Sequence, residues 1–492
     1  MKKSINYIKN NMLLIILACQ PFLDILAYIQ RDFSISMAGY IRLALTVCVP
    51  LYTLIVTKKK KPFFLIMAVI AGFCFLHVLN TLRGGAGSFF NDTKYMLLVA
   101  HAPIMLFSFM FLYEKESIKK QITIALILNV ITSVIVFYLS YLLQSGNCTY
   151  PLFQTGWTGW YVIPNAQSLI LSSLITFAVY FSIKYCKYYF PLLSLPLIYM
   201  YTMNGTKATF GALLIAFGSI LGFTLLEVIF LKAKRERFEI YKILMSVVLI
   251  AVSLACYTFS PRQIINSTTE AHRQQEQAAL EEQQELEEEL AEEEEKLNDK
   301  ESDDSGDKVI KNKKFYVKYI NPNLIDRFGA NRVLDAYAEG DNLNSYGLSN
   351  MRLKKLIYAR LTWEECDFVT RLVGFDFTKM QHKDDNFDLE NDPQAILYYY
   401  GYFGAALYIA FIGYFLLRLL KKLFTKFKES FNLYNFTLLI TLVLQLVSAA
   451  YSGYMLRRPN VAIYLAITLL LIYCQTEPLF EKKDIEKAEN EK

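Results

Sequence analysis

The sequence predicts an all-α polytopic membrane protein with about twelve transmembrane helices and one large helical loop outside the membrane. Of its 492 residues, 54% are hydrophobic, 15% are aromatic and only 20% are charged, and the mean hydropathy is +0.27. These values are too apolar for an ordinary soluble chain of this length. The apolar residues also arrive in blocks of about 18 to 24, separated by short charged clusters, which is typical of repeated bilayer crossings.

Twelve apolar segments are predicted as spans, because most are long enough to cross about 30 Å of hydrocarbon as a helix. They are Met12–Ile29, Ala38–Val56, Phe63–Asn80, Lys94–Tyr113, Gln121–Leu143, Asn165–Ser182, Tyr188–Tyr201, Thr206–Leu231, Ile240–Phe259, Pro393–Leu417, Phe431–Ala450 and Pro459–Cys474. The seventh is short and contains Pro191 and Pro196. It is therefore expected either to cross the membrane or to form a bent or re-entrant segment.

The positions of Lys and Arg predict the orientation, because basic loops tend to stay cytoplasmic. The segments that share a side with the N-terminus hold about half of the 51 basic residues. The short loops of the other side hold only Arg31, Arg83, Lys94, Lys207, Arg457 and Arg458. We therefore expect a multi-pass membrane protein with both termini in the cytoplasm. The net charge of +6 sums opposite biases on the two sides, so it does not indicate nucleic-acid binding.

This topology divides the chain into four parts. Residues 1–260 would hold the first nine helices, 261–392 an extracytoplasmic loop, 393–476 the last three helices and 477–492 a cytoplasmic tail. Within the loop, residues 270–307 are acidic and of low complexity, which is typical of a solvated helix or a disordered insert. Residues 321–392 instead carry apolar side chains at helical spacing, which predicts a packed helical part.

Several kinds of site are not expected. The four histidines show no zinc spacing with one another or with cysteine, and the phosphate-binding loop of ATP-driven pumps does not occur. Only Cys148 and Cys366 are clearly extracytoplasmic, which is too few for a disulfide framework. We predict neither a metal site nor a cofactor.

Asp24 and Arg42 are polar residues inside predicted spans. Both lie within roughly 10 Å of the outer surface, at nearly one depth, so they are expected to be able to pair. One interpretation is a functional pair. The other is that Arg42 reaches the lipid headgroups while Asp24 faces a hydrated crevice.

Basic residues recur on almost every outer segment. They include Arg83, Lys207 and Arg352, together with His77, Lys94, Lys354, Lys355, Arg360, Arg371, Arg457 and Arg458. Any one of them can be explained by contact with lipid phosphates. As a set they favour a site for a phosphate or diphosphate, because Arg and Lys are the residues that hold such groups. The outer segment Gln144–Pro164 instead carries tryptophan and tyrosine, for which an interfacial belt is favoured over a platform for sugar rings.

Carboxylates and His382 cluster just before the tenth predicted span. A general base beside cations is what glycosyl transfer from a lipid diphosphate needs, since the base activates the acceptor hydroxyl and the cations stabilise the leaving group. Glu390 is the first candidate for the base. Asp392, which precedes Pro393, is expected to cap the helix.

Three segments resemble the bacterial O-antigen ligase and O-antigen polymerase superfamily. NGTKATFGALLIA, Asn204–Ala216, is similar to a family segment that opens a span, with Lys207 where arginine is usual. SNMRLKKLIYA and the later RLVGFDF place Arg352 at the family arginine and Gly374 at a family glycine. LENDPQAILYYYGYFG places Gly401 and Gly404 at two further family glycines.

Counting back from Gly401, the family's functional histidine falls on Glu390. The resemblance therefore implies that Glu390 takes this role, or that His382 does so from eight residues earlier.

The resemblance further implies a metal-independent, inverting glycosyltransferase of the GT-C-like membrane type. It would transfer glycan from undecaprenyl diphosphate to a hydroxyl of a glycan or glycolipid acceptor on the outer face, either polymerising or ligating surface polysaccharide. Arg42, Arg83, Lys207 and Arg352 would hold the diphosphate.

A transporter or flippase of polysaccharide precursors is the alternative. Such proteins usually show related halves, and the sequence shows no convincing internal repeat.

Overall fold

The computed structural model describes residues 9–31, 37–84, 89–230, 237–268, 270, 317, 319–340 and 342–477. Nearly all of the predicted acidic insert, from residue 271 on, lies outside the described residues, as does the tail beyond residue 477.

Each of the twelve predicted spans falls on helical structure. The helices are α2 (Met12–Ala18) with α3 (Gln20–Ile29), α4 (Met37–Val56), α5 (Lys60–Arg83), α6 (Phe89–Leu112), α7 (Lys115–Leu142), α8 (Pro164–Cys186), α9 (Phe190–Asn204), α10 (Lys207–Phe230), α11 (Arg237–Thr258), α19 (Asp392–Thr425), α21 (Leu433–Tyr451) and α22 (Pro459–Gln475). The prediction of an all-α polytopic membrane protein is confirmed. Among the described residues, ten stretches are long and apolar enough to cross a membrane.

The described part of the structure has ten such stretches and the sequence predicted twelve spans, and this difference has two sources. First, α8 and α9 are joined by the short helix η2 (Lys187–Tyr189), so that residues 164–204 form one helical stretch of 41 residues. The weak seventh segment, with Pro196 inside it, thus continues from its neighbour through a bend at Lys187. Second, α22 is apolar but has only 17 residues. The exact number of crossings stays a prediction.

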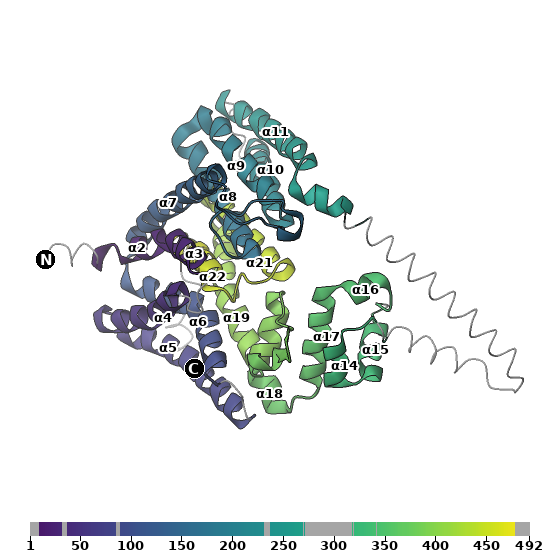
Figure 1. Ribbon diagram of the computed structural model, residues 1–492. Helices are drawn as coiled ribbons and strands as arrows, with labels where there is room; N and C mark the ends of the chain where they lie inside the picture. Colours follow the sequence, from purple (N-terminus) through teal and green to yellow (C-terminus); the bar gives the residue numbers. More distant parts are fainter. Residues whose placement is uncertain are drawn as a thin grey trace, which may run out of the picture.

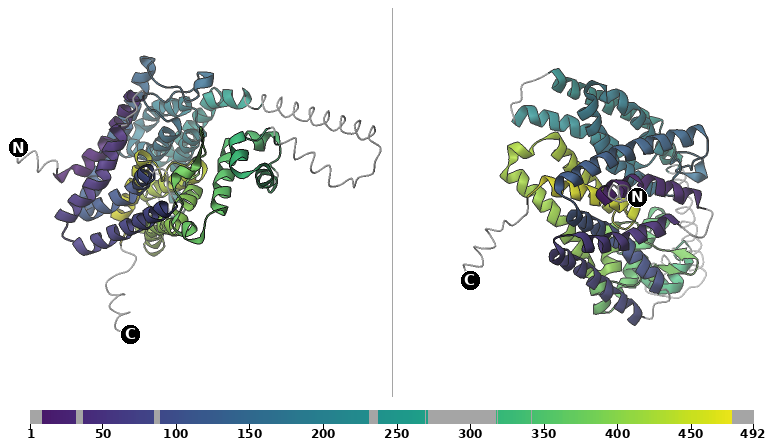
Figure 2. Two further views of the ribbon diagram at one scale, coloured as in Figure 1. Left: turned by 60° about the horizontal axis from the view of Figure 1, so that its bottom comes forward. Right: turned by 90° about the vertical axis from the view of Figure 1, so that its left-hand side faces the viewer.

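Helices α8 and α22 form the centre of the bundle, since most of the residues in them are buried. Helices α10 and α11 lie at one edge and α4 and α5 at the opposite edge (Figure 1 and Figure 2). Hydroxyl and amide groups join α8 to α21: Thr176 Oγ1 lies 2.6 Å from Thr441 Oγ1, and Gln445 donates to Ser173 across 3.1 Å. Such contacts hold membrane helices together where lipid offers no hydrophobic driving force.

The segment after residue 317 forms short elements that lie beside the start of α19 (Figure 1). They are α14 (Pro322–Phe328), α15 (Ala330–Ala338), α16 (Ser345–Ser349), α17 (Met351–Glu364), α18 (Phe368–Val373), the turn η3 (Phe377–Met380) and an antiparallel pair of strands, β1 (Gln381–His382) and β2 (Asp385–Asn386). Within the small core of these elements, the rings of Tyr358 and Phe387 stack with their centroids 4.1 Å apart. We call these elements the outer helices.

A buried polar network docks the outer helices on α5 and α6. His77 Nε2 lies 3.1 Å from Asp92 Oδ2, and His77 Nδ1 lies 2.8 Å from the carbonyl of Val373. The other oxygen of Asp92 accepts the backbone N–H of Phe377 at 3.0 Å. His77 therefore has a structural role, in which it helps to hold the outer helices against α5 and α6. Its ring is fully buried.

Two of the glycines identified in the sequence pack backbone against backbone. Gly374 ends α18 with φ of +91°, and Gly401 interrupts the helical geometry of α19 with φ of +68°. A Cβ at Gly374 would collide with the backbone of Tyr399, and a Cβ at Gly401 with that of Leu372. Only glycine satisfies both the dihedral angles and this close approach.

Candidate functional site

A polar cavity of about 510 Å³ lies where α8, α10 and α17 begin and α21 ends. We call it the first cavity. Its lining brings together three residues that the sequence identified as candidates, Lys207, Arg352 and Glu390. The full lining is Tyr150, Asn165, Ser168, Thr206, Lys207, Ala208, Arg262, Ser349, Asn350, Met351, Arg352, Glu390, Tyr451 and Ser452.

Three helix N-termini converge on this cavity. Asn165, Lys207 and Met351 lie in the first turns of α8, α10 and α17, and all three line it. The N-terminus of a helix carries a partial positive charge and backbone N–H groups without partners inside the helix. The fold thus directs a positive potential at the cavity, which favours an anionic ligand.

Three basic side chains, Lys207, Arg262 and Arg352, add full charges to this potential. Arg262 follows the ninth predicted span directly. Its Nη1 donates to Tyr150 Oη at 3.1 Å, while its buried Nε has no hydrogen-bond partner among the described residues. The sequence analysis missed Arg262. The signal was present, since an arginine just beyond the predicted outer end of a span extends the same set of outer cations.

Glu390 is the one acid among the described residues that line the cavity. Its Oε2 accepts from Arg352 Nε at 2.7 Å, and its Oε1 lies 3.2 Å from Lys355 Nζ. Burial alone would raise the pKa of Glu390, but Lys355 and Arg352 outweigh it and hold this pKa below the ordinary value. The side chain is therefore an ionised carboxylate at neutral pH.

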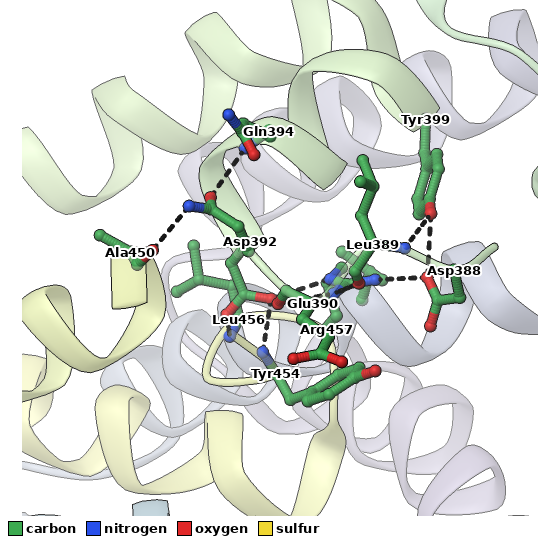
Figure 3. Close-up of polar contacts among 12 residues, drawn as sticks. Asp388, Leu389, Glu390, Asp392, Gln394, Tyr399, Ala450, Tyr454, Leu456 and Arg457 are labelled. Atoms are coloured by element: carbon green, nitrogen blue, oxygen red, sulfur yellow. Dashed lines mark hydrogen bonds and ion pairs between the residues drawn. The ribbon is translucent and has the colours of Figure 1, made fainter. Parts of the chain in front are cut away.

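A buried arginine fixes the segment that carries Glu390 (Figure 3). Arg457 Nε lies 2.8 Å from Asp392 Oδ1, and its Nη1 lies 2.9 Å from Asp388 Oδ1. Its Nη2 donates to the backbone carbonyls of Leu389 and Glu390. Arg457 is 2% exposed, so its guanidinium is engaged by these partners and cannot contact a ligand.

Asp392 does not cap α19, contrary to the sequence-based expectation. The cap is Asn391, whose side-chain oxygen accepts the backbone N–H of Gln394 at 3.2 Å. Asp392 instead binds Arg457 and accepts the backbone N–H groups of Tyr454 and Leu456, each at 2.8 Å. The reason is that Asp392 is fully buried against the loop before α22, where a single carboxylate serves three donors.

The other candidate residues lie elsewhere. The expected pair of Asp24 and Arg42 is present, with Arg42 Nη2 2.8 Å from Asp24 Oδ1, but it lines a separate cavity. Arg83 is half exposed and pairs with Asp367. His382 Nε2 lies 2.9 Å from Asp326 Oδ2 on the outer helices. None of these three basic residues lines the first cavity.

The aromatic segment before α8 does not form a simple interfacial belt. Trp157 is buried, and its indole N–H donates to Ser140 Oγ at 3.0 Å. Tyr150 and Tyr161 line the first cavity and the separate cavity, respectively.

Within the described ranges, no three His, Cys, Asp or Glu side chains gather in a way that could hold a metal ion.

Comparison with protein families matches residues 5–477 to the O-antigen ligase like membrane proteins. The chain belongs to this family. Membership indicates a membrane enzyme of surface polysaccharide assembly that acts on lipid-linked glycans. Comparisons with curated proteins and with solved structures gave no match. In this O-antigen ligase like protein, the three segments in which the sequence resembles the family contribute Lys207, Arg352 and Glu390 to the first cavity. The second and third segments also meet where Gly374 and Gly401 pack backbone against backbone.

Proposed function

We propose that the protein is a GT-C-type glycosyltransferase of the bacterial cell membrane. It transfers glycan from undecaprenyl diphosphate to a hydroxyl of a glycan or glycolipid acceptor on the extracytoplasmic face. One observation carries this proposal: Lys207, Arg262 and Arg352 line a cavity with Glu390, at the convergence of three helix N-termini.

The cations and helix N-termini would bind the donor diphosphate. Lys207, Arg262 and Arg352 come from three separate segments, so they can surround a diphosphate from several directions. Positive groups held in place before the reaction stabilise charge that develops on a leaving group. We propose that these residues perform that task without a metal ion.

Glu390 would act as the general base. In a single displacement, the acceptor hydroxyl gives its proton to Glu390, and its oxygen forms a bond to the anomeric carbon of the donor glycan. The bond between that carbon and the diphosphate breaks, and the electron pair leaves with undecaprenyl diphosphate. Attack from the face opposite the leaving group inverts the anomeric centre.

The ion pair between Arg352 and Glu390 suggests how the base is activated. The Arg352 side chain is 50% exposed, so an incoming diphosphate can compete with Glu390 for the guanidinium. Once Arg352 turns to the phosphate, Glu390 loses a cation and gains an anionic neighbour. Both changes raise the pKa of Glu390 and make it a stronger base.

A transfer assay tests the proposal and separates it from a transporter. Purified protein in nanodiscs is incubated with undecaprenyl-diphosphate-linked repeat units and acceptor glycan, without nucleotide. We expect a longer glycan and an equal amount of released undecaprenyl diphosphate. In proteoliposomes, translocation of the lipid-linked glycan without a new glycosidic bond would contradict the proposal and support a flippase.

A further inference from the structure

A second cavity, of about 300 Å³ and with more apolar than polar surface, lies on another face of the start of α8. Gln167 and Ile170 of α8 line this second cavity, whereas Asn165 and Ser168 line the first. Its other walls come from the end of α3, the start of α4 and the start of α22. Both cavities thus open at the same end of the helix bundle. The diphosphate site proposed above makes no use of the second one.

The lining of the second cavity carries three guanidinium groups, of Arg31, Arg42 and Arg458, against one carboxylate, of Asp24. Asp24 is already paired, because its Oδ1 accepts from Arg42 at 2.8 Å and from Asn460 at 3.2 Å. Within the described part of the chain Arg458 has no carboxylate partner, and its guanidinium lies 4.1 Å from the centroid of the Tyr454 ring. The lining therefore keeps an excess of positive charge that suits an anion.

Neutral hydrogen-bonding groups make up most of the remaining polar lining. Gln30, Gln167 and Asn460 contribute amides, and Tyr161 contributes an aromatic ring. Amides pair with hydroxyl groups as both donors and acceptors. A cavity of this volume is at the lower end of the range for small-molecule sites, which suits a single sugar residue. Cations with amides and an aromatic ring thus match a sugar that carries a phosphate or a carboxylate.

Two connections join the second cavity to the first. Gln167 Oε1 accepts from Asn204 Nδ2 at 3.3 Å, and Asn204 Oδ1 accepts from Thr206 of the first cavity at 3.1 Å. The loop between α21 and α22 places Ser452 in the first cavity and Arg458 in the second. Between them lies Arg457, which fixes Glu390.

We propose that the second cavity binds an anionic saccharide of the acceptor, which bears a phosphate or a carboxylate. This inference rests on the proposed function, in which the donor diphosphate occupies the first cavity and the acceptor needs a site of its own. Arg458 provides the charge, and the amides bind the sugar hydroxyls.

Binding without donor tests the inference independently of turnover. Protein in phosphatidylcholine nanodiscs is titrated, in a calorimeter, with short fragments of the surface polysaccharide of the bacterium that makes the protein. The fragments are used intact or after chemical removal of phosphate and reduction of carboxylates. We expect Arg458→Gln to weaken binding of the intact fragments roughly tenfold, the effect of one lost charge-assisted hydrogen bond. Arg458→Lys should restore most of the affinity.

The matched control is Arg327→Gln, which removes an arginine from the exposed ion pair with Glu365 on the outer helices. It should bind like the unmodified protein. Neutralised fragments should bind the unmodified protein as weakly as intact fragments bind Arg458→Gln. Equal affinity of Arg458→Gln and the unmodified protein, or of neutral and intact fragments, would overturn the inference.

Two further measurements identify the ligand. Adding phosphatidylglycerol to the nanodiscs should leave fragment binding unchanged, and a fall to the level of Arg458→Gln would show a lipid headgroup site instead. In the transfer assay, Arg458→Gln should raise the acceptor KM and leave the donor KM unchanged. A rise in the donor KM alone would refute the assignment to the acceptor. If the unmodified protein shows no transfer, the proposed function fails while the binding result still stands.

Discussion

Arg352 Nε lies 2.7 Å from Glu390 Oε2, so the strongest candidate cation and the candidate base of the first cavity are bound to each other. The contact joins the first turn of α17 to the residue before the cap of α19, 38 positions later in the chain. The pair is accessible, with the side chains 50% and 20% exposed. A diphosphate that binds Arg352 would therefore change the electrostatic surroundings of the base at the same time.

Glu390→Gln should lower kcat of glycan transfer by about 10²–10⁴-fold, because general-base catalysis contributes an acceleration of this size. The amide keeps the shape of the side chain, so donor binding should change little. The control is Glu365→Gln, which makes the same chemical change in an exposed ion pair with Arg327. Full activity of Glu390→Gln would assign the base to another residue, with His382→Ala as the next variant to assay.

Lys207→Met should raise the donor KM roughly tenfold, since it removes one charged contact to the diphosphate. Lys207→Arg should retain activity, because the side chain remains a cation at the start of α10. Steady-state kinetics with varied donor concentration distinguish the two. Equal donor KM values for the methionine variant and the unmodified protein would show that Lys207 only contacts the membrane surface.

The lowered pKa of Glu390 predicts a pH profile. Above the ordinary glutamate pKa the side chain of the free enzyme is ionised, so kcat/KM for the donor should not fall until the pH drops below that value. Arg352→Ala removes one of the cations that lower this pKa, so the acid limb of the kcat/KM profile should move to higher pH. An acid limb at the same pH in both proteins would mean that another group controls it.

The same shift makes a prediction about stability. Because the folded-state pKa of Glu390 is below its unfolded value, the ion pair stabilises the fold at pH above the unfolded pKa, and this contribution is lost as pH falls through the folded pKa. Glu390→Gln should therefore reduce the acid sensitivity of the melting temperature, measured between neutral pH and about pH 4. An unchanged slope would contradict this role for the ion pair.

Arg457→Met should destabilise the protein by about 3–5 kcal/mol, because it leaves the buried carboxylates without their cation. Asp392 is fully buried and pairs with Arg457 at 2.8 Å. Thermal unfolding in detergent measures the loss. The double variant Arg457→Met with Asp392→Asn should recover part of it. No recovery would show that the hydrogen bonds of Arg457 to backbone carbonyls matter more than its charge.

Gly401→Ala should lower stability by more than about 1 kcal/mol, because alanine disfavours a positive φ and its Cβ would collide with Leu372. Gly413 supplies a control on the same helix, since a Cβ there meets nothing within 4 Å. Gly413→Ala should be neutral or slightly stabilising. If the two variants melt at the same temperature, the close contact between α18 and α19 is not important for stability.

The sequence predicted the helical spans, because hydropathy follows the depth of a residue in the membrane. It also singled out Lys207, Arg352 and Glu390, which the fold brings to one cavity. It could not predict which helices are neighbours around the bundle. Arg42 and Lys207 both lie at the predicted outer ends of spans, yet they line different cavities.

The sequence could not predict ion pairs between residues that are far apart in the chain either. Arg457 counted in the sequence as one more rim cation, but the fold buries it against Asp388 and Asp392, more than 60 positions earlier. Arg83 pairs with Asp367, and His382 pairs with Asp326, only once the outer helices have packed. Such pairings depend on tertiary contacts, for which a single sequence holds no local signal.

A donor-bound structure tests the central claim most directly. Glu390→Gln protein in nanodiscs, which should bind but not transfer, would be imaged by electron cryomicroscopy with an undecaprenyl-diphosphate-linked repeat unit. We predict density for the diphosphate in the first cavity, in contact with Lys207, Arg262 and Arg352, with the first sugar facing residue 390. Diphosphate density outside that cavity, with the three basic side chains left unengaged, would contradict the account.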